Sequence, residues 1–142
     1  MIRLNGKENK EKIEKLSVDH MEILLDSNII IYSSYPSNKF LLDFIQEHSI
    51  SVSAISFVEV LGYHLLKKEE KHFLETFFNN SNIIPLDYSI LLQAVNLKQQ
   101  KKISLGDSLV AATALEKDLT LVTHNTIDFS WIKNLSVLDP FK

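Results

Sequence analysis

Short apolar segments alternate with helical patterns along most of this chain, and that order limits the folds open to it. The apolar segments are strand candidates at 22–26, 50–54, 82–86, 119–123 and 135–138. Helical spacing of apolar residues occupies 39–48, 55–66, 69–80, 88–102 and 106–118. Strands separated by helices predict parallel βαβ units. We therefore expect an α/β, three-layer fold with a central, mostly parallel sheet of four to five strands covered by helices.

The first strand candidate supports this prediction, because Ile23, Leu24 and Leu25 form an unbroken apolar run. Such runs are typical of strands buried on both faces. The chain has 142 residues, of which 45% are hydrophobic and 23% are charged, as in an ordinary domain with one core. We expect a polar extension at 1–20 and a single domain at 21–142, where Met21 stands at a conventional start.

Several functional classes are disfavoured by composition. The chain has no cysteine, which excludes disulfides and thiolate sites. It also has neither an apolar run of about 18 residues nor the apolar centre of a secretory signal, so we expect a cytoplasmic protein without membrane spans. A net charge of −3 gives nucleic acid no global attraction. Two lysine groups, at 67–71 and 98–102, are either local basic patches or solvated helix faces.

The segment "LTLVTHNTIDF" at 119–129 is a strand candidate that ends in polar side chains. Asp26 likewise follows the first strand candidate. In parallel sheets, ligands bind beyond the carboxyl ends of the strands. We therefore expect Asp26 and the segment 123–128 to meet at one edge of the sheet.

Four acidic residues lie far from any Lys or Arg in the sequence: Asp26, Glu59, Asp107 and Asp128. A carboxylate withdrawn from water needs a cation or strong hydrogen bonds. Alternative roles are open for each of them. The three aspartates can cap helices, and "SLGD" at 104–107 resembles a capping box. Glu59 is in the middle of a helical pattern and can simply face solvent. A shared site for Mg²⁺ or Mn²⁺, which prefer carboxylate oxygens, accounts for all four together.

These segments resemble the PIN domain family, and most closely its VapC-type ribonuclease toxins. The resemblance rests on "LLDSN" at 24–28, "SFVEVLGY" at 56–63, "LGDSLVAATAL" at 105–115 and "LVTHNTIDF" at 121–129, in that order. It implies that Asp26, Glu59, Asp107 and Asp128 form an acidic catalytic pocket that binds metal, with Asp26 and Asp107 as the foremost ligands. It further implies that Asn28, Thr123 and Asn125 support the acids or a metal-bound water.

The resemblance implies a metal-dependent endoribonuclease that cleaves RNA with activated water, leaving 5′-phosphate and 3′-hydroxyl ends. It also implies a homodimer and a cognate antitoxin protein. The segment "HFLETFF" at 72–78 is apolar enough on one side to contact another chain or the core. Two other functions stay open: a PIN-fold binding module without catalysis, and a housekeeping RNA-processing nuclease. We interpret the five histidines, His124 included, as ordinary surface or helix-face residues.

Two other phosphoryl-transfer families fit the sequence poorly. A haloacid-dehalogenase-like phosphatase needs a second Asp two residues after its nucleophile, and Asn28 stands there. A receiver domain has paired acids before its phosphorylated Asp, which "EILLD" lacks.

Overall fold

A five-stranded sheet forms the centre of the computed structural model, which describes residues 20–142. The strand order is β3-β2-β1-β4-β5, and every neighbouring pair is parallel. The strands are β1 Glu22–Leu25, β2 Ser49–Ser53, β3 Asn82–Ile84, β4 Thr120–Val122 and β5 Val137–Leu138. The prediction of a parallel α/β sheet is confirmed, and the parallel pairing extends to all five strands.

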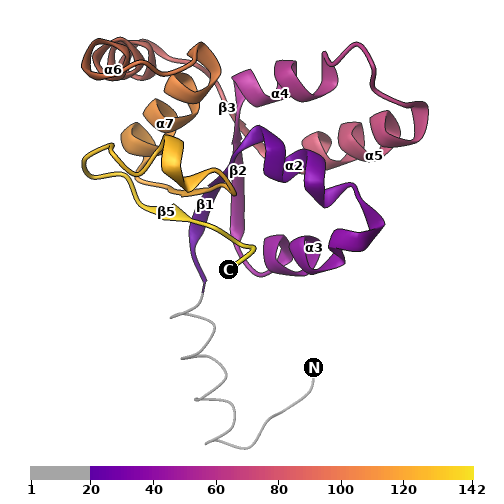
Figure 1. Cartoon of the computed structure of the whole chain (residues 1–142). Coiled ribbons are helices and arrows are strands. Elements are labelled where there is room, and N and C mark those ends of the chain that lie inside the picture. The colour runs from indigo at the N-terminus through magenta and orange to yellow at the C-terminus, as the bar shows by residue number, and fades with distance from the viewer. Residues whose placement is uncertain (1–19) are drawn as a thin grey trace, which may run out of the picture.

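Helices cover both faces of this sheet and give three layers (Figure 1). The helices are α2 Ser27–Ser33, α3 Lys39–Gln46, α4 Ala54–Leu61, α5 Lys68–Asn79, α6 Tyr88–Gln100 and α7 Leu105–Lys117. One face packs against α6 and α7, while α2 to α5 supply the buried residues on the other face. Within residues 20–142, no helix is long and apolar enough to cross a membrane.

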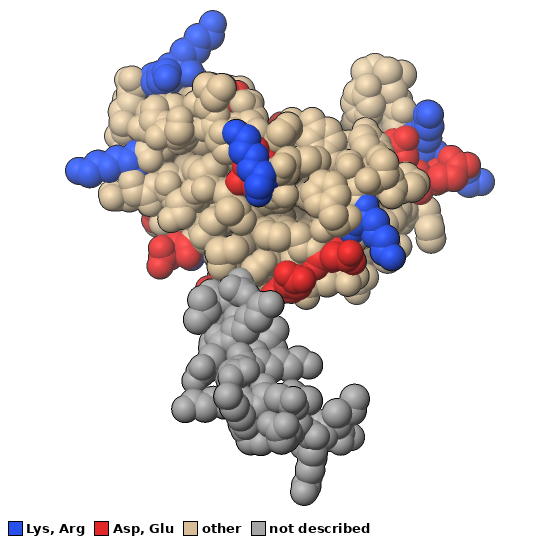
Figure 2. Space-filling view, turned by 60° about the horizontal axis from the view of Figure 1, so that its bottom comes forward, with Lys and Arg blue, Asp and Glu red and all other residues tan. Residues whose placement is uncertain are grey.

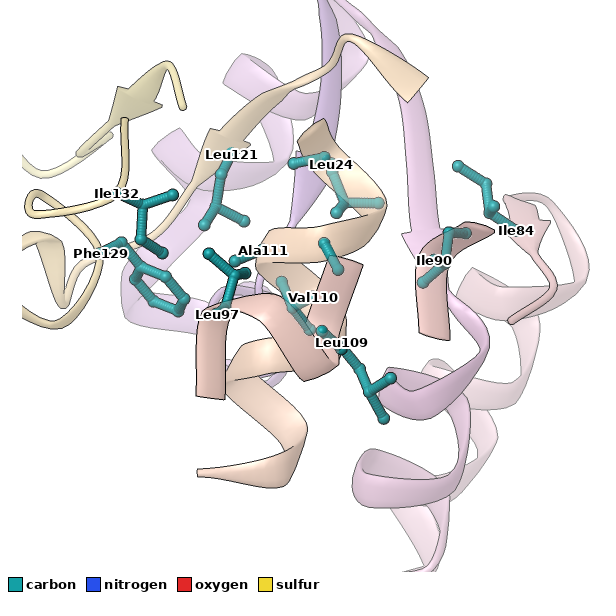
Figure 3. Close-up of a cluster of buried hydrophobic side chains, with 13 residues drawn as sticks. Leu24, Ile84, Ile90, Leu97, Leu109, Val110, Ala111, Leu121, Phe129 and Ile132 are labelled. Carbon is teal, nitrogen blue, oxygen red and sulfur yellow. The ribbon is translucent and has the colours of Figure 1, made fainter. Parts of the chain in front are cut away.

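Alternate residues of the central strands enter the two cores. Leu24 of β1 and Leu121 of β4 point toward α7 and α6, in the cluster drawn in Figure 3. Ile23, Leu25 and Val122 enter the opposite cluster. All five side chains are fully buried. Burial of each such side chain contributes roughly 1.5–3 kcal/mol, which explains why the apolar run of β1 is unbroken.

Two of the predicted helix assignments were wrong. Helix α2 was not among the predicted helices, because Ile29, Ile30 and Ile31 are consecutive β-branched residues that give no helical spacing. Helix α4 ends at Leu61, five residues before its predicted end at 66. Gly62, a poor helix former, occupies its C-cap and donates its backbone N–H to the Val58 carbonyl oxygen.

The apolar side of "HFLETFF" packs into the core of the chain. Leu74 and Phe78 are 1% exposed, and Phe73 and Phe77 pack around them. Core packing therefore explains this segment without a second chain. The predicted polar extension at 1–20 lies outside the described residues, except for His20.

Charged side chains are scattered over the face shown in Figure 2. Basic side chains lie singly or in small groups, several of them next to acidic ones, so this face has no continuous basic band among the described residues. Attraction of a polyanion to this face would depend on a few local lysines.

Candidate metal-binding site at the carboxyl edge of the sheet

The central strands β1 and β4 bring Asp26 next to the polar segment 123–128. Their parallel register pairs Leu25 with Val122, so the next residues, Asp26 and Thr123, leave the sheet side by side. The backbone N–H of Asp26 donates to the Val122 carbonyl oxygen at 3.0 Å. Asp26 is only 6% exposed and Thr123 is fully buried. The expected meeting of these two segments is therefore present in the structure.

Both carboxylate oxygens of Asp26 accept hydrogen bonds. Oδ1 accepts from the backbone N–H of Ser27 at 2.8 Å, and Oδ2 accepts from the Thr123 hydroxyl at 2.8 Å. Asp26 is also the N-cap of α2. The capping role that the sequence left open for Asp26 is therefore confirmed, and a role in a metal site stays a prediction. The two hydrogen bonds fix the carboxylate at the sheet edge.

A chain of hydrogen bonds runs from Asp26 to Asp128. Thr123 Oγ1 accepts from the backbone N–H of Asn125 at 3.1 Å, and Asn125 Nδ2 donates to Asp128 Oδ2. Asp128 is the last residue of the 3-10 turn η2, Thr126–Asp128, whose N-cap is Asn125. The alternative that Asp128 is itself an N-cap is therefore wrong. Thr123 and Asn125 connect the two acids, while Asp128 stays exposed.

Glu59 reaches the same edge from the exposed side of α4. Its Oε1 accepts a 2.9 Å hydrogen bond from the Ser27 hydroxyl, which shares another bond with the Ser56 hydroxyl. Its Oε2 lies against Gly106 of α7, where a Cβ atom would come within 2.5 Å. Glycine at 106 therefore permits the Glu59 carboxylate to lie between α2 and α7.

Asp107 enters the site from the first turn of α7. Ser104 is the N-cap of this helix, and its hydroxyl accepts from the backbone N–H of Asp107 at 3.1 Å. The capping prediction for "SLGD" thus holds for Ser104. The Asp107 side chain is partly buried and lines a hollow together with Asp128.

Burial and mutual repulsion raise the pKa values of two of these acids. Burial raises the pKa of the Asp26 carboxyl, and repulsion from Asp107 and Glu59 adds to it, against the hydrogen bonds from Thr123 and Ser27. Burial likewise raises the pKa of Asp107, aided by Asp128 and Glu59 and opposed by a hydrogen bond with Ser104. A bound cation would relieve this repulsion, because it favours the ionised form of each carboxyl.

The carboxylates at this edge suit a hard divalent cation that takes only some of its ligands from the protein. Within residues 20–142, no three acidic or histidine side chains are grouped closely enough to enclose an ion by themselves. Mg²⁺ commonly binds through one or two carboxylates, with water and substrate phosphate completing its shell. Asp26 and Asp107, both partly withdrawn from water and electrostatically coupled, fit that mode.

Asn28 and Asn125, two of the residues selected from the sequence, line a hollow that Asp26 also borders. Asn28 is exposed, and with Asp26, Tyr32, His124 and Asn125 it lines this second hollow of about 290 Å³. His124 Nδ1 lies 3.1 Å from Asp139 Oδ2, which gives the imidazole a partner of its own. A supporting role for Asn28 stays a prediction, as do the roles of the four acids.

Sequence reasoning did not select Ser27 and Gly106, which contact Glu59, or Ser56, whose hydroxyl accepts from that of Ser27. "LLDSN" and "LGD" contain two of these residues, but their contacts with Glu59 arise only where α2, α4 and α7 meet. It also assigned no role to Trp131, which lines the hollow that contains Asp107 and Asp128.

Comparisons with known proteins agree with this architecture. Ribonuclease VapC2 of Rickettsia felis is 31% identical over 129 residues, covering 81% of this chain and 95% of that protein. A chain of a toxin–antitoxin complex from Klebsiella pneumoniae is 27% identical, with a TM-score of 0.68, covering 84% of this chain and 98% of its own length. A chain of VapBC2 from Rickettsia felis, bound to a promoter DNA fragment, is 25% identical with a TM-score of 0.70, covering 82% of this chain and 96% of its own length.

The model of the PIN domain matches residues 23–133, which include strands β2 to β4, nearly all of β1 and all four acids. The resemblance seen in the sequence is therefore confirmed: this chain belongs to the PIN domain family.

Proposed function

We propose that this chain is a divalent-metal-dependent endoribonuclease that acts as the toxin of a toxin–antitoxin pair. The observation that carries the proposal is the buried Asp26 carboxylate, held by Thr123 and Ser27 and repelled by Asp107 and Glu59. Such a cluster is costly without a cation. The relative named Ribonuclease VapC2, which aligns along most of both chains, supports the reaction class.

Asp26 and Asp107 would hold Mg²⁺ or Mn²⁺ directly, with Glu59 and Asp128 as further acidic groups of the pocket. When bound, the metal would polarise the scissile phosphate and activate a water molecule for attack. Thr123 fixes the Asp26 carboxylate, and Ser27 fixes that of Glu59. Asn125 orients Asp128. Because water and not the ribose 2′-hydroxyl attacks, the products are a 5′-phosphate and a 3′-hydroxyl.

A single-stranded RNA segment is the expected substrate, because its backbone and bases are accessible. A solved relative described as a toxin–antitoxin complex supports an antitoxin protein as the partner. We further propose a homodimer that acts in the cytoplasm, where its RNA substrate is present.

Cleavage of mixed cellular RNA tests the reaction. We expect cleavage with Mg²⁺ or Mn²⁺, none with EDTA, and a loss of at least about 100-fold in Asp26→Asn and Asp107→Asn. Asp43→Asn, at an exposed position of α3, is the matched control and should cleave as wild type does. Equal cleavage by all four proteins would refute the assigned site.

Growth distinguishes a toxin from a housekeeping nuclease. Expression without an antitoxin should arrest growth, and expression of soluble Asp26→Asn should not. Normal growth in the presence of soluble, RNA-cleaving wild-type protein would contradict the toxin assignment and favour a housekeeping nuclease.

A further inference from the structure

A hollow of about 440 Å³ lies beside the candidate metal site, and its lining contains lysines and an aromatic ring as well as acids. Asp107 and Asp128 line it. Lys101, Lys102, Ile127 and Trp131 belong to the same lining. Its volume falls within the range of roughly 300–1,000 Å³ that is usual for small-ligand sites. A nucleotide-sized group would therefore fit next to the acids.

The two lysines in this hollow are available to bind an anion. Both are exposed, and neither forms an ion pair with any carboxylate of residues 20–142, even though Asp107 and Asp128 line the same hollow. The Lys101 ammonium lies 5.6 Å from the centre of the Trp131 ring. These lysines are one of the two basic groups seen in the sequence. Their position beside the acids distinguishes them from an ordinary solvated helix face.

The Trp131 ring is held in place while part of it stays exposed. Its Nε1–H donates to the Asp128 backbone carbonyl oxygen at 2.8 Å, and part of the ring packs on the core between the sheet and α7. Ile127, on the same turn, is 82% exposed. An aromatic ring fixed beside unpaired lysines is the usual platform on which single-stranded nucleic acid stacks a base.

We propose that this hollow binds one nucleotide of single-stranded RNA next to the scissile phosphate. Trp131 and Ile127 contact the base, and Lys101 and Lys102 contact the backbone phosphates. The inference rests on the proposed ribonuclease function and names a substrate-binding site for it. A stacked base is bound with little regard to its identity, because every base has a π-face. Trp131 therefore contributes affinity for the strand and leaves the choice of base to other contacts.

Binding can be measured without cleavage, because Trp131 is the single tryptophan of the chain. A short oligoribonucleotide of mixed sequence is titrated into the full chain in EDTA, which stops the proposed reaction. We expect saturable quenching of tryptophan fluorescence by single-stranded RNA, and much weaker quenching by the same sequence as a duplex. Equal binding of both forms, or RNA binding that leaves the fluorescence unchanged, would overturn the proposal.

Paired charge variants test the lysines. Lys101→Gln with Lys102→Gln should weaken binding and reduce the slope of log affinity against log salt by about 1.4, since each lost phosphate contact on a single strand accounts for about 0.7. Lys67→Gln with Lys68→Gln removes the same charge at the start of α5, whose buried residues pack on the opposite face of the sheet. This control should bind RNA as wild type does. Equal effects of the two pairs would refute a local site.

Substitution of the ring separates stacking from folding. Trp131→Leu should weaken binding of a dye-labelled oligoribonucleotide, measured by anisotropy, by about 5-fold to more than 100-fold. Trp131→Phe keeps an aromatic face and should bind within a few-fold of wild type, with both variants checked by circular dichroism. An unchanged affinity in folded Trp131→Leu would overturn the proposal.

The two proposals can fail separately. Saturable quenching in EDTA, with no cleavage of any RNA in Mg²⁺ or Mn²⁺, would support the nucleotide site and reject the nuclease function. Metal-dependent cleavage, with unchanged RNA binding in the Lys101 and Lys102 double variant, would support the nuclease function and reject the nucleotide site. Quenching by an antitoxin peptide and not by RNA would overturn the RNA site in favour of a protein one.

Discussion

The Thr123 hydroxyl donates a 2.8 Å hydrogen bond to Asp26 Oδ2, although 97 positions separate the two residues in the sequence. The bond is buried, and the parallel register of β1 and β4 creates it by placing the two residues side by side. Burial raises the pKa of Asp26, and this hydrogen bond opposes the rise because it stabilises the ionised carboxylate. Thr123 thus links the fold of the sheet to the charge state of the candidate site.

Removal of this hydroxyl by Thr123→Val should weaken metal binding and RNA cleavage by about 10- to 100-fold, as expected for a residue that orients a ligand. It leaves a buried Asp26 oxygen without its donor and deprives the Asn125 N–H of its acceptor. Loss of such a bond to a charged group also costs about 1.5–3 kcal/mol of stability. Calorimetric titration with Mn²⁺ and urea unfolding measure the two effects.

Thr113→Val is the matched control. Thr113 is fully buried in α7, and its hydroxyl donates to the Leu109 carbonyl oxygen of its own helix, away from the acids. The change should leave Mn²⁺ affinity unaltered. If Thr123→Val bound Mn²⁺ as tightly as Thr113→Val does, an orienting role for Thr123 would be excluded.

The raised pKa of Asp26 predicts how its charge affects stability. The folded state holds the proton more tightly than the unfolded state, where the carboxyl titrates near 3.8. The contribution of the Asp26 carboxyl to the free energy of unfolding is therefore fully present below pH 3.8. It is lost as the pH rises through the raised pKa of the folded state. In EDTA, Asp26→Asn should gain stability relative to wild type across that window and hold the gain at neutral pH.

Thermal unfolding from pH 3 to pH 8 measures this difference, with Asp43→Asn as a control at an exposed acid. The replaced hydrogen bonds of Asp26 contribute a constant offset, so the informative quantity is the change with pH. A difference between Asp26→Asn and wild type that stayed flat, or that fell with rising pH, would contradict a carboxylate destabilised by burial. Saturating Mg²⁺ should reduce the advantage of the variant, because a cation stabilises the ionised form.

The central packing can be tested at Leu24, which is fully buried between the sheet and α7. Leu24→Ala should destabilise the protein by about 2–5 kcal/mol, since the lost side chain leaves a cavity. Leu92→Ala, at a position of α6 that is 52% exposed, should cost much less. Urea unfolding measures both. Equal losses of unfolding free energy in the two variants would contradict the position of Leu24 in the core.

The sequence was sufficient to predict the parallel sheet, because hydrophobic periodicity and element order depend on local patterns. It was also sufficient to predict that Asp26 and segment 123–128 share an edge, which follows from parallel topology. Helix α2 was missed because Ile29 to Ile31 have strand-like propensity, yet Asp26 caps the helix and its neighbours bury it. Tertiary packing therefore outweighed the local β propensity of the three isoleucines and made this segment a helix.

Contacts that depend on the approach of two helices could not be predicted. Ser27 and Gly106 lie beside predicted acids in the sequence, but both contact Glu59, which belongs to a different helix. The role proposed for Trp131 could not be predicted, for the same reason. Its relation to Lys101 and Asp107 depends on how the turn after β4 packs against the loop between α6 and α7.

The contact between Gly106 and Glu59 yields the last prediction. In Gly106→Ala, the new methyl group would come within 2.5 Å of Glu59 Oε2, so the flexible carboxylate must turn away and leave the Ser27 hydroxyl. Stability should hold or rise by less than about 1 kcal/mol, because alanine is the better helix former. Cleavage should fall by about 10-fold or more as Glu59 leaves the site.

A double-mutant cycle isolates this cause. With Glu59→Ala the steric conflict is gone, so adding Gly106→Ala should produce no further loss of cleavage. Initial rates of RNA cleavage with Mn²⁺ measure all four proteins, and thermal unfolding checks their folding. Full additivity of the two losses would mean that Gly106 acts on cleavage independently of Glu59, and the carboxylate would not need its place between α2 and α7.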